Sequence, residues 1–206
     1  MAIEYEVGAE ELHKIGEVGA KRIKTWLDST YRFRIDQTIY DLDPSGNPYT
    51  RLRVPQLQSG RFERFDLVGS LLDEDAQPGH EIYVECKVYS DAGNQGVLYD
   101  EYLAVCYSAF VALSVGLGGP ADVEFMWATT HPFAVTNYTR LLEPEQIQDA
   151  CEKHPERLGD EAFDLSIAQQ LAPRLWLAIV NNRVEEMIMG LELRKAVAER
   201  IVELAS

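Results

Sequence analysis

Two acids and a lysine stand inside apolar, β-rich stretches of the sequence, where charged residues are uncommon. Glu85 and Lys87 lie two positions apart in segment 82–88, and Asp66 lies in segment 64–69. Side chains two apart in a strand point to the same face of a sheet, so Glu85 and Lys87 should be neighbours. Because burial of an unpaired charge is expensive, we expect these side chains to face each other or a ligand.

Oxygen atoms from these residues would suit a hard divalent cation. Asp66, Glu85 and the main-chain carbonyl of Cys86 offer ligands to Mg²⁺ (or Mn²⁺), and Mg²⁺ prefers an octahedral oxygen shell with several waters. The metal would lower the pKa of one water and make it a nucleophile, and Lys87 would orient that water and help to neutralise the transition state. The pattern predicts metal-assisted hydrolysis of a phosphodiester bond. The alternative is a structural Glu–Lys pair on a sheet surface, which contributes little stability.

The order and spacing of these residues resemble a known signature. The run Asp66…Glu85-Cys86-Lys87 resembles the D…(D/E)xK motif of the PD-(D/E)xK, or restriction-endonuclease-like, nuclease superfamily. The chain departs from the strict motif because Phe65, not proline, precedes the first acid. The resemblance implies a Mg²⁺-dependent deoxyribonuclease. It also implies an α/β fold with a core of order α-β-β-β-α-β, in which a central mixed sheet is flanked by helices.

Two further motifs extend the resemblance. Glu17, within a Gly-Glu-Val-Gly run, is similar to the N-terminal acidic motif of the family, which implies that Glu17 is an outer metal ligand. Gln95 and Tyr99 match the QxxxY motif of the RecB-like exonuclease branch. Positions four apart share one helical face, so both side chains would look toward the metal site or a substrate phosphate. The alternatives are a solvated helix charge for Glu17 and a packed helix–sheet contact for Tyr99.

Hydrophobic periodicity predicts the elements that position these residues. Gly16 and Gly19 interrupt the first helix and would let a neighbouring backbone come close. The glycine-rich segment 116–120 should end the long central helix. We expect helices over 9–28, 95–115, 144–153, 164–180 and 184–204, strands over 31–42, 61–71, 81–89 and 122–130, and a turn over 43–48. The domain organisation that follows is a nuclease core at 1–135 and a helical extension at 136–206 packed on it.

Composition restricts the class of protein. Apolar residues make up 46% of the 206 residues, enough for a core, and no run approaches the roughly 20 apolar residues of a membrane span. The acidic N-terminus does not resemble a signal peptide, so we expect a cytoplasmic protein with no membrane partner. The three cysteines include no CxxC pair and the four histidines are scattered, which disfavours zinc and predicts reduced thiols.

Charge is distributed unevenly along the chain, whose formal net charge is −15. Residues 1–65 hold ten Lys/Arg and ten Asp/Glu, whereas residues 66–206 hold nine and 24. Any contact with nucleic acid should therefore use the first part, and the acidic remainder would face away from substrate or meet a basic partner. The apolar residues in 164–204, including Met187 and Met189, provide more apolar surface than one helical stripe packed on a sheet requires. They predict a homo-oligomer or partner interface, or else simply complete the domain.

The function expected from the residues and the resemblance is hydrolysis of DNA in a bacterial anti-phage defence, restriction or repair system. Two alternatives remain open. The fold could serve as a catalytically inactive interaction subunit of a larger complex, or the substrate could be RNA. Divalent-metal binding and a substrate screen would separate these possibilities.

Overall fold

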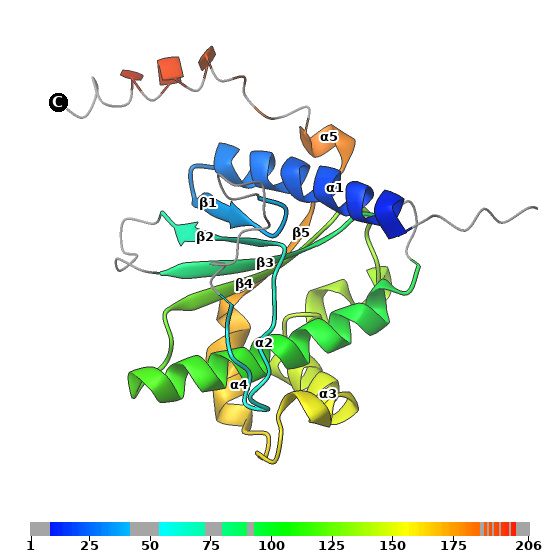
Figure 1. Ribbon diagram of the computed structural model, residues 1–206, viewed down its shortest axis with the longest axis vertical. Coiled ribbons are helices and arrows are strands. Elements are labelled where there is room, and N and C mark those ends of the chain that lie inside the picture. The colour runs from blue at the N-terminus through cyan, green and yellow to red at the C-terminus, as the bar shows by residue number, and fades with distance from the viewer. Residues whose placement is uncertain are drawn as a thin grey trace, which may run out of the picture.

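A mixed sheet of five strands lies between two layers of helices in the computed structural model (Figure 1). α1 covers one face of the sheet, and α2, α3 and α4 cover the other. The structure describes residues 9–41, 54–72, 80–89 and 93–185, with scattered positions between 188 and 200. The elements are α1 (Ala9–Ser29), β1 (Phe33–Thr38), β2 (Leu67–Leu71), β3 (Glu81–Lys87), α2 (Gln95–Leu117), β4 (Val123–Thr129), the 3₁₀ turn η1 (Val135–Arg140), α3 (Pro144–Lys153), η2 (Pro155–Arg157), α4 (Leu165–Leu171), η3 (Ala172–Arg174), β5 (Leu175–Ile179) and α5 (Asn182–Glu185).

The strands follow one another across the sheet in the order β1-β2-β3-β4-β5. β1, β2 and β3 pair antiparallel, and β3, β4 and β5 pair parallel. Parallel neighbours require a crossover, which α2 provides between β3 and β4. The predicted α/β class and the order α-β-β-β-α-β are confirmed for the first six elements.

Each face of the sheet supports its own hydrophobic core. Ile82 and Val84 of β3 pack in the core beneath α1, and Tyr83 packs in the core beneath α2. α1 comes close to the sheet because it carries glycines on its inner side. A methyl group on Gly16 would stand 2.5 Å from the Tyr40 hydroxyl, and one on Gly19 would overlap Val88.

α2 is the central helix of the second layer. Its 23 residues end where Gly118 adopts φ 69°, a left-handed cap that glycine allows at little cost. Within the described part of the chain, α2 alone has the length and hydropathy of a membrane span, but half of its apolar window is buried inside the protein. Contacts with α3 and β4 make α2 part of the packed core.

The prediction of one helix over 164–180 is wrong. α4 ends at Leu171, a 3₁₀ turn containing Pro173 follows, and Leu175–Ile179 forms β5 beside β4. A short apolar run has no periodicity that separates a buried strand from a buried helix, and pairing with β4 decides the outcome. The region after residue 135 is therefore not a purely helical extension, because it completes the sheet.

Other boundaries differ in ways that matter for the site. The strand predicted over 61–71 begins only at Leu67, and segment 54–66 instead crosses α2 on its way to β2 (Figure 1). The predicted turn at 43–48 lies outside the described residues, as do Met187, Met189 and much of the helix predicted over 184–204.

Candidate metal and catalytic site

The junction of β2 and β3 brings the two predicted acids together. In the antiparallel register the last pair is Leu67 with Val84, so Asp66 comes just before this pair and Glu85 just after it. Asp66 sits in a bend just before β2, and its Oδ2 accepts a 2.8 Å hydrogen bond from the main-chain N–H of Cys86.

Glu85 and Lys87 form a pair on the α2 side of β3, as their spacing predicted. Lys87 Nζ lies 2.7 Å from Glu85 Oε1, and the two side chains are 26% and 21% exposed. The ammonium also stands 5.7 Å from the ring centre of Trp127, the residue of β4 that pairs with Glu85. Lys87 is thus held between a carboxylate and an aromatic face.

Asp66, Glu85 and Lys87 together contain two acidic groups and only one basic group. Burial, followed by the charge of Asp66, raises the pKa of Glu85 from 4.5 to about 7, although Lys87 opposes the shift. Burial also raises the pKa of Asp66, against the Cys86 N–H and Lys87. Burial lowers the pKa of Lys87, but the carboxylates of Glu85 and Asp66 raise it further, so its pKa lies above the ordinary value. One lysine therefore does not fully compensate the two acids.

Tyr40 lies beside Gly16 of α1 and within the electrostatic influence of the two acids. The sequence analysis did not identify this tyrosine. Burial raises the pKa of its phenol to about 12, and the charges of Asp66, Cys86, Glu85 and Glu17 add to the shift. The phenol therefore stays protonated beside these acids. Glu17 Oε1 lies 2.5 Å from Lys21 Nζ on the surface of α1. The charge of Glu17 therefore acts on the Tyr40 phenol from the helix. Its role as an outer metal ligand stays a prediction.

Gln95 and Tyr99 occupy the first turns of α2 but make internal contacts. Gln95 Oε1 accepts a hydrogen bond of 2.7 Å from Thr129, and Gln95 Nε2 donates one to the carbonyl of His131. The Tyr99 hydroxyl donates to the carbonyl of Leu141 at 2.9 Å. Both side chains are buried and neither lines the pocket that holds Glu85 and Lys87. The structure thus places Tyr99 in the helix–sheet interface.

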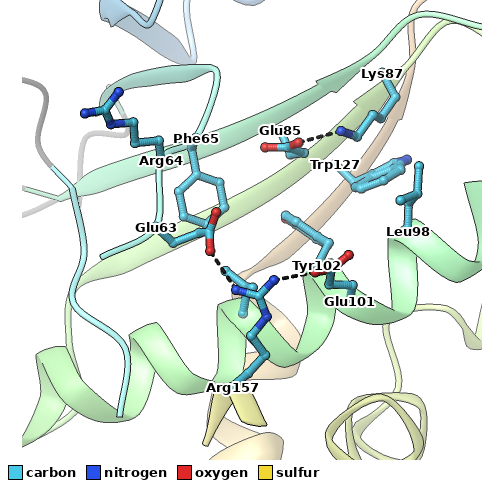
Figure 2. Close-up of a pocket in the computed structure, with 11 residues that line it drawn as sticks. Glu63, Arg64, Phe65, Glu85, Lys87, Leu98, Glu101, Tyr102, Trp127 and Arg157 are labelled. Carbon is cyan, nitrogen blue, oxygen red and sulfur yellow. Dashed lines mark hydrogen bonds and ion pairs between the residues drawn. The ribbon is translucent and has the colours of Figure 1, made fainter. Parts of the chain in front are cut away.

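A pocket of about 150 Å³ opens beside Glu85 and Lys87 on the α2 side of the sheet (Figure 2). Phe65, Tyr102 and Trp127 contribute aromatic walls. A guanidinium stands on the opposite side of the pocket, where Arg157 NH1 lies 2.9 Å from Glu63 Oε2 and NH2 contacts Glu101 (Figure 2). The sequence carried no signal for this arginine, because it comes from η2, far from the motif.

The residues present fit a divalent cation that needs few protein ligands. Two partly buried carboxylates repel each other, and a cation between them would relieve that repulsion. Asp66 Oδ2 is engaged by the Cys86 N–H, which leaves its other oxygen and those of Glu85 as candidate ligands. No group of three or more His, Cys, Asp or Glu side chains is arranged for a metal among the described residues, so the Cys86 carbonyl and water would complete the shell. The three cysteines are unpaired thiols, as predicted.

Comparison with known proteins found no matching family model, no similar curated protein and no similar solved structure. The case for a function therefore depends on the geometry and charge of the residues described above.

Proposed function

We propose that the chain is a Mg²⁺-dependent nuclease that hydrolyses phosphodiester bonds in DNA, with Asp66, Glu85 and Lys87 at its active centre. The observation that carries the proposal is a pair of partly buried acids at one strand junction, each with a raised pKa, with Lys87 paired to Glu85. A soluble domain has no structural need for this arrangement, because burial of like charges is costly. Such clusters mark functional sites.

Each residue has a part that follows from its place. Asp66, Glu85 and the carbonyl of Cys86 would hold the metal, and a bound Mg²⁺ would activate a water and stabilise charge on the phosphate. Lys87 is charged at neutral pH, since its pKa is raised. Its ammonium can orient the attacking water and neutralise the phosphoryl oxygens. The aromatic face of Trp127 restricts where Lys87 can point.

The architecture supports the same proposal. The order α-β-β-β-α-β and the mixed sheet agree with a restriction-endonuclease-like core, with Glu85 and Lys87 on β3 and Asp66 just before β2. The net charge of −15 opposes approach to a polyanion. The proposal therefore includes a second copy of the chain or a larger partner protein in the cytoplasm, which would deliver DNA in defence, restriction or repair.

The test is cleavage of plasmid and linear DNA in Mg²⁺ or Mn²⁺, with wild type compared with Lys87→Ala. The matched control is Lys153→Ala, which removes another ion-paired lysine, 2.6 Å from Asp100 on the surface. We expect wild type and Lys153→Ala to cleave, and Lys87→Ala to be at least about 100-fold slower. Equal rates for Lys87→Ala and wild type would remove Lys87 from the mechanism. An RNA substrate in parallel decides between the two nucleic acids.

One observation favours a second candidate function. The Cys86 N–H already satisfies one oxygen of Asp66, and this is how a structural acid would be held. A chain that neither binds metal nor cleaves nucleic acid would therefore be an interaction module, with its acidic surface facing a basic partner.

A further inference from the structure

Arg157 is placed like a ligand-binding residue at the wall of the pocket. Its guanidinium contacts Glu63, in the segment before β2, and Glu101, on α2. Its Nε is buried and has no hydrogen-bond acceptor within the described residues, since the Glu156 oxygen near it is 3.8 Å away. A buried donor without an acceptor is uncommon in folded proteins, and a water or a ligand can supply the missing acceptor.

The backbone of this arginine is fixed before any ligand binds. Ser108 Oγ donates a 2.6 Å hydrogen bond to the Arg157 carbonyl and accepts one from the Gln58 N–H. Gly159, two residues on, adopts φ 68° and packs against Ser59. The guanidinium therefore projects from a rigid turn, so little entropy is lost when it binds.

The carboxylates that hold Arg157 can be displaced. Glu63 and Glu101 are 34% and 39% exposed, whereas Arg157 is 18% exposed. Exposed ion pairs contribute little net stability, because water solvates the released carboxylate. A backbone phosphodiester carries one negative charge, as a carboxylate does, and its two unbridged oxygens match the planar fork of a guanidinium, so it competes for the same donors.

Arg157 shares its pocket with two residues of the candidate active centre, where a substrate phosphate would bind. Glu63, Glu85, Lys87 and Arg157 line one pocket (Figure 2), and the charge of Glu63 reaches Glu85. We propose that Arg157 binds a backbone phosphate of the nucleic acid, and that Glu63 occupies its guanidinium until that phosphate displaces it. This inference rests on the proposed nuclease function and adds a binding residue from outside the motif.

The test measures binding of a short, fluorescent single-stranded DNA by anisotropy over a range of NaCl concentrations. Ca²⁺ replaces Mg²⁺, and a gel shows that the oligonucleotide stays intact. The variants are Arg157→Gln and Glu63→Gln. The matched controls are Arg140→Gln and Glu143→Gln, which break a surface Arg–Glu pair of 3.2 Å outside the pocket.

Arg157→Gln should weaken binding by about tenfold, the loss expected for a hydrogen bond to a charged group. It should also reduce the slope of log K against log salt by about 0.7, because one phosphate contact is lost. Glu63→Gln should tighten binding several-fold relative to Glu143→Gln, since it removes one of the two carboxylates that compete for the guanidinium. If Arg157→Gln fails to fold, Arg157→Lys should keep the slope but weaken binding.

The outcomes separate the two proposals. Wild-type cleavage with an unchanged slope in Arg157→Gln, or weaker binding in Glu63→Gln, would overturn the role of Arg157 and leave the nuclease proposal intact. Weaker binding in Glu63→Gln would mean that the pair is only a structural clamp. A wild type that neither binds nor cleaves DNA would end both proposals.

Discussion

Two glutamates in the same sheet, Glu124 and the less buried Glu85, differ in which groups compensate their charge. Glu124 of β4 has one oxygen 3.0 Å from His80 Nε2, and its other oxygen accepts a 2.7 Å hydrogen bond from Trp176 Nε1. Glu85 of β3 has Lys87, but it also feels the charge of Asp66. Hydrogen bonds within the protein thus satisfy Glu124, whereas a bound cation would reduce the repulsion between Glu85 and Asp66. The comparison indicates which acid supports the fold and which one serves a ligand.

The largest expected effect separates the two glutamates by activity. Glu85→Gln removes a metal ligand at constant volume, so we expect metal-dependent cleavage to fall by at least about 100-fold. Glu124→Gln should keep the wild-type rate per folded molecule. Cleavage of linear DNA, normalised to folded protein by circular dichroism, measures both. Similar losses in the two variants would contradict the distinction.

Stability should show the opposite order. Glu124→Gln directs an amide NH₂ toward either the His80 ring or the Trp176 N–H and removes the charged acceptor that serves both groups. We expect about 1–3 kcal/mol less free energy of unfolding. Urea unfolding at neutral pH measures this loss. An unchanged midpoint would show that Glu124 is not the structural acid of the pair.

The pH dependence of stability gives a third comparison. The pKa of Glu85 in the folded state is about 7, above the ordinary glutamate value of 4.5. Between pH 4.5 and about 7 the folded state therefore holds the proton of Glu85 more tightly than the unfolded state does. This contribution is fully present below pH 4.5 and is lost as pH rises through about 7. In Glu85→Gln the fall in unfolding free energy across that window should be smaller than in wild type. Urea unfolding at a series of pH values tests the sign, and identical profiles would contradict it.

The repulsion between the acids can be measured at Glu85 itself. Asp66→Asn keeps an acceptor for the Cys86 N–H but removes the charge that raises the pKa of Glu85. We therefore expect the pKa of Glu85 to fall in this variant, and to rise in Lys87→Met, which removes the opposing cation. Carbon-13 NMR of the glutamate carboxyls follows both shifts. No change in Asp66→Asn would mean that the acids do not share one site.

The smallest expected effect concerns Tyr99. Tyr99→Phe removes only the hydrogen bond to the Leu141 carbonyl, so it should cost about 1 kcal/mol of stability and leave cleavage unchanged. Thermal unfolding and the cleavage assay measure the two quantities together. A large loss of activity with normal stability would return Tyr99 to the active centre.

Local patterns predicted the parts of the fold that local chemistry controls. The alternation of β3, the start of α2 at Gln95 and its end at Gly118 all follow from nearby residues. The strand β5 could not be predicted in this way, because pairing with β4 determines its conformation. The contacts of Tyr40 and Arg157 could not be predicted from local patterns either, since their partners lie far away in the sequence.

Diffraction from crystals grown with Mn²⁺, recorded at the manganese absorption edge, addresses the metal most directly. We predict one anomalous peak coordinated by side-chain oxygens from residues 66 and 85 and by the main-chain oxygen of residue 86. Crystals with no such peak, or with these two side chains directed to different layers of the domain, would contradict the assignment of this centre.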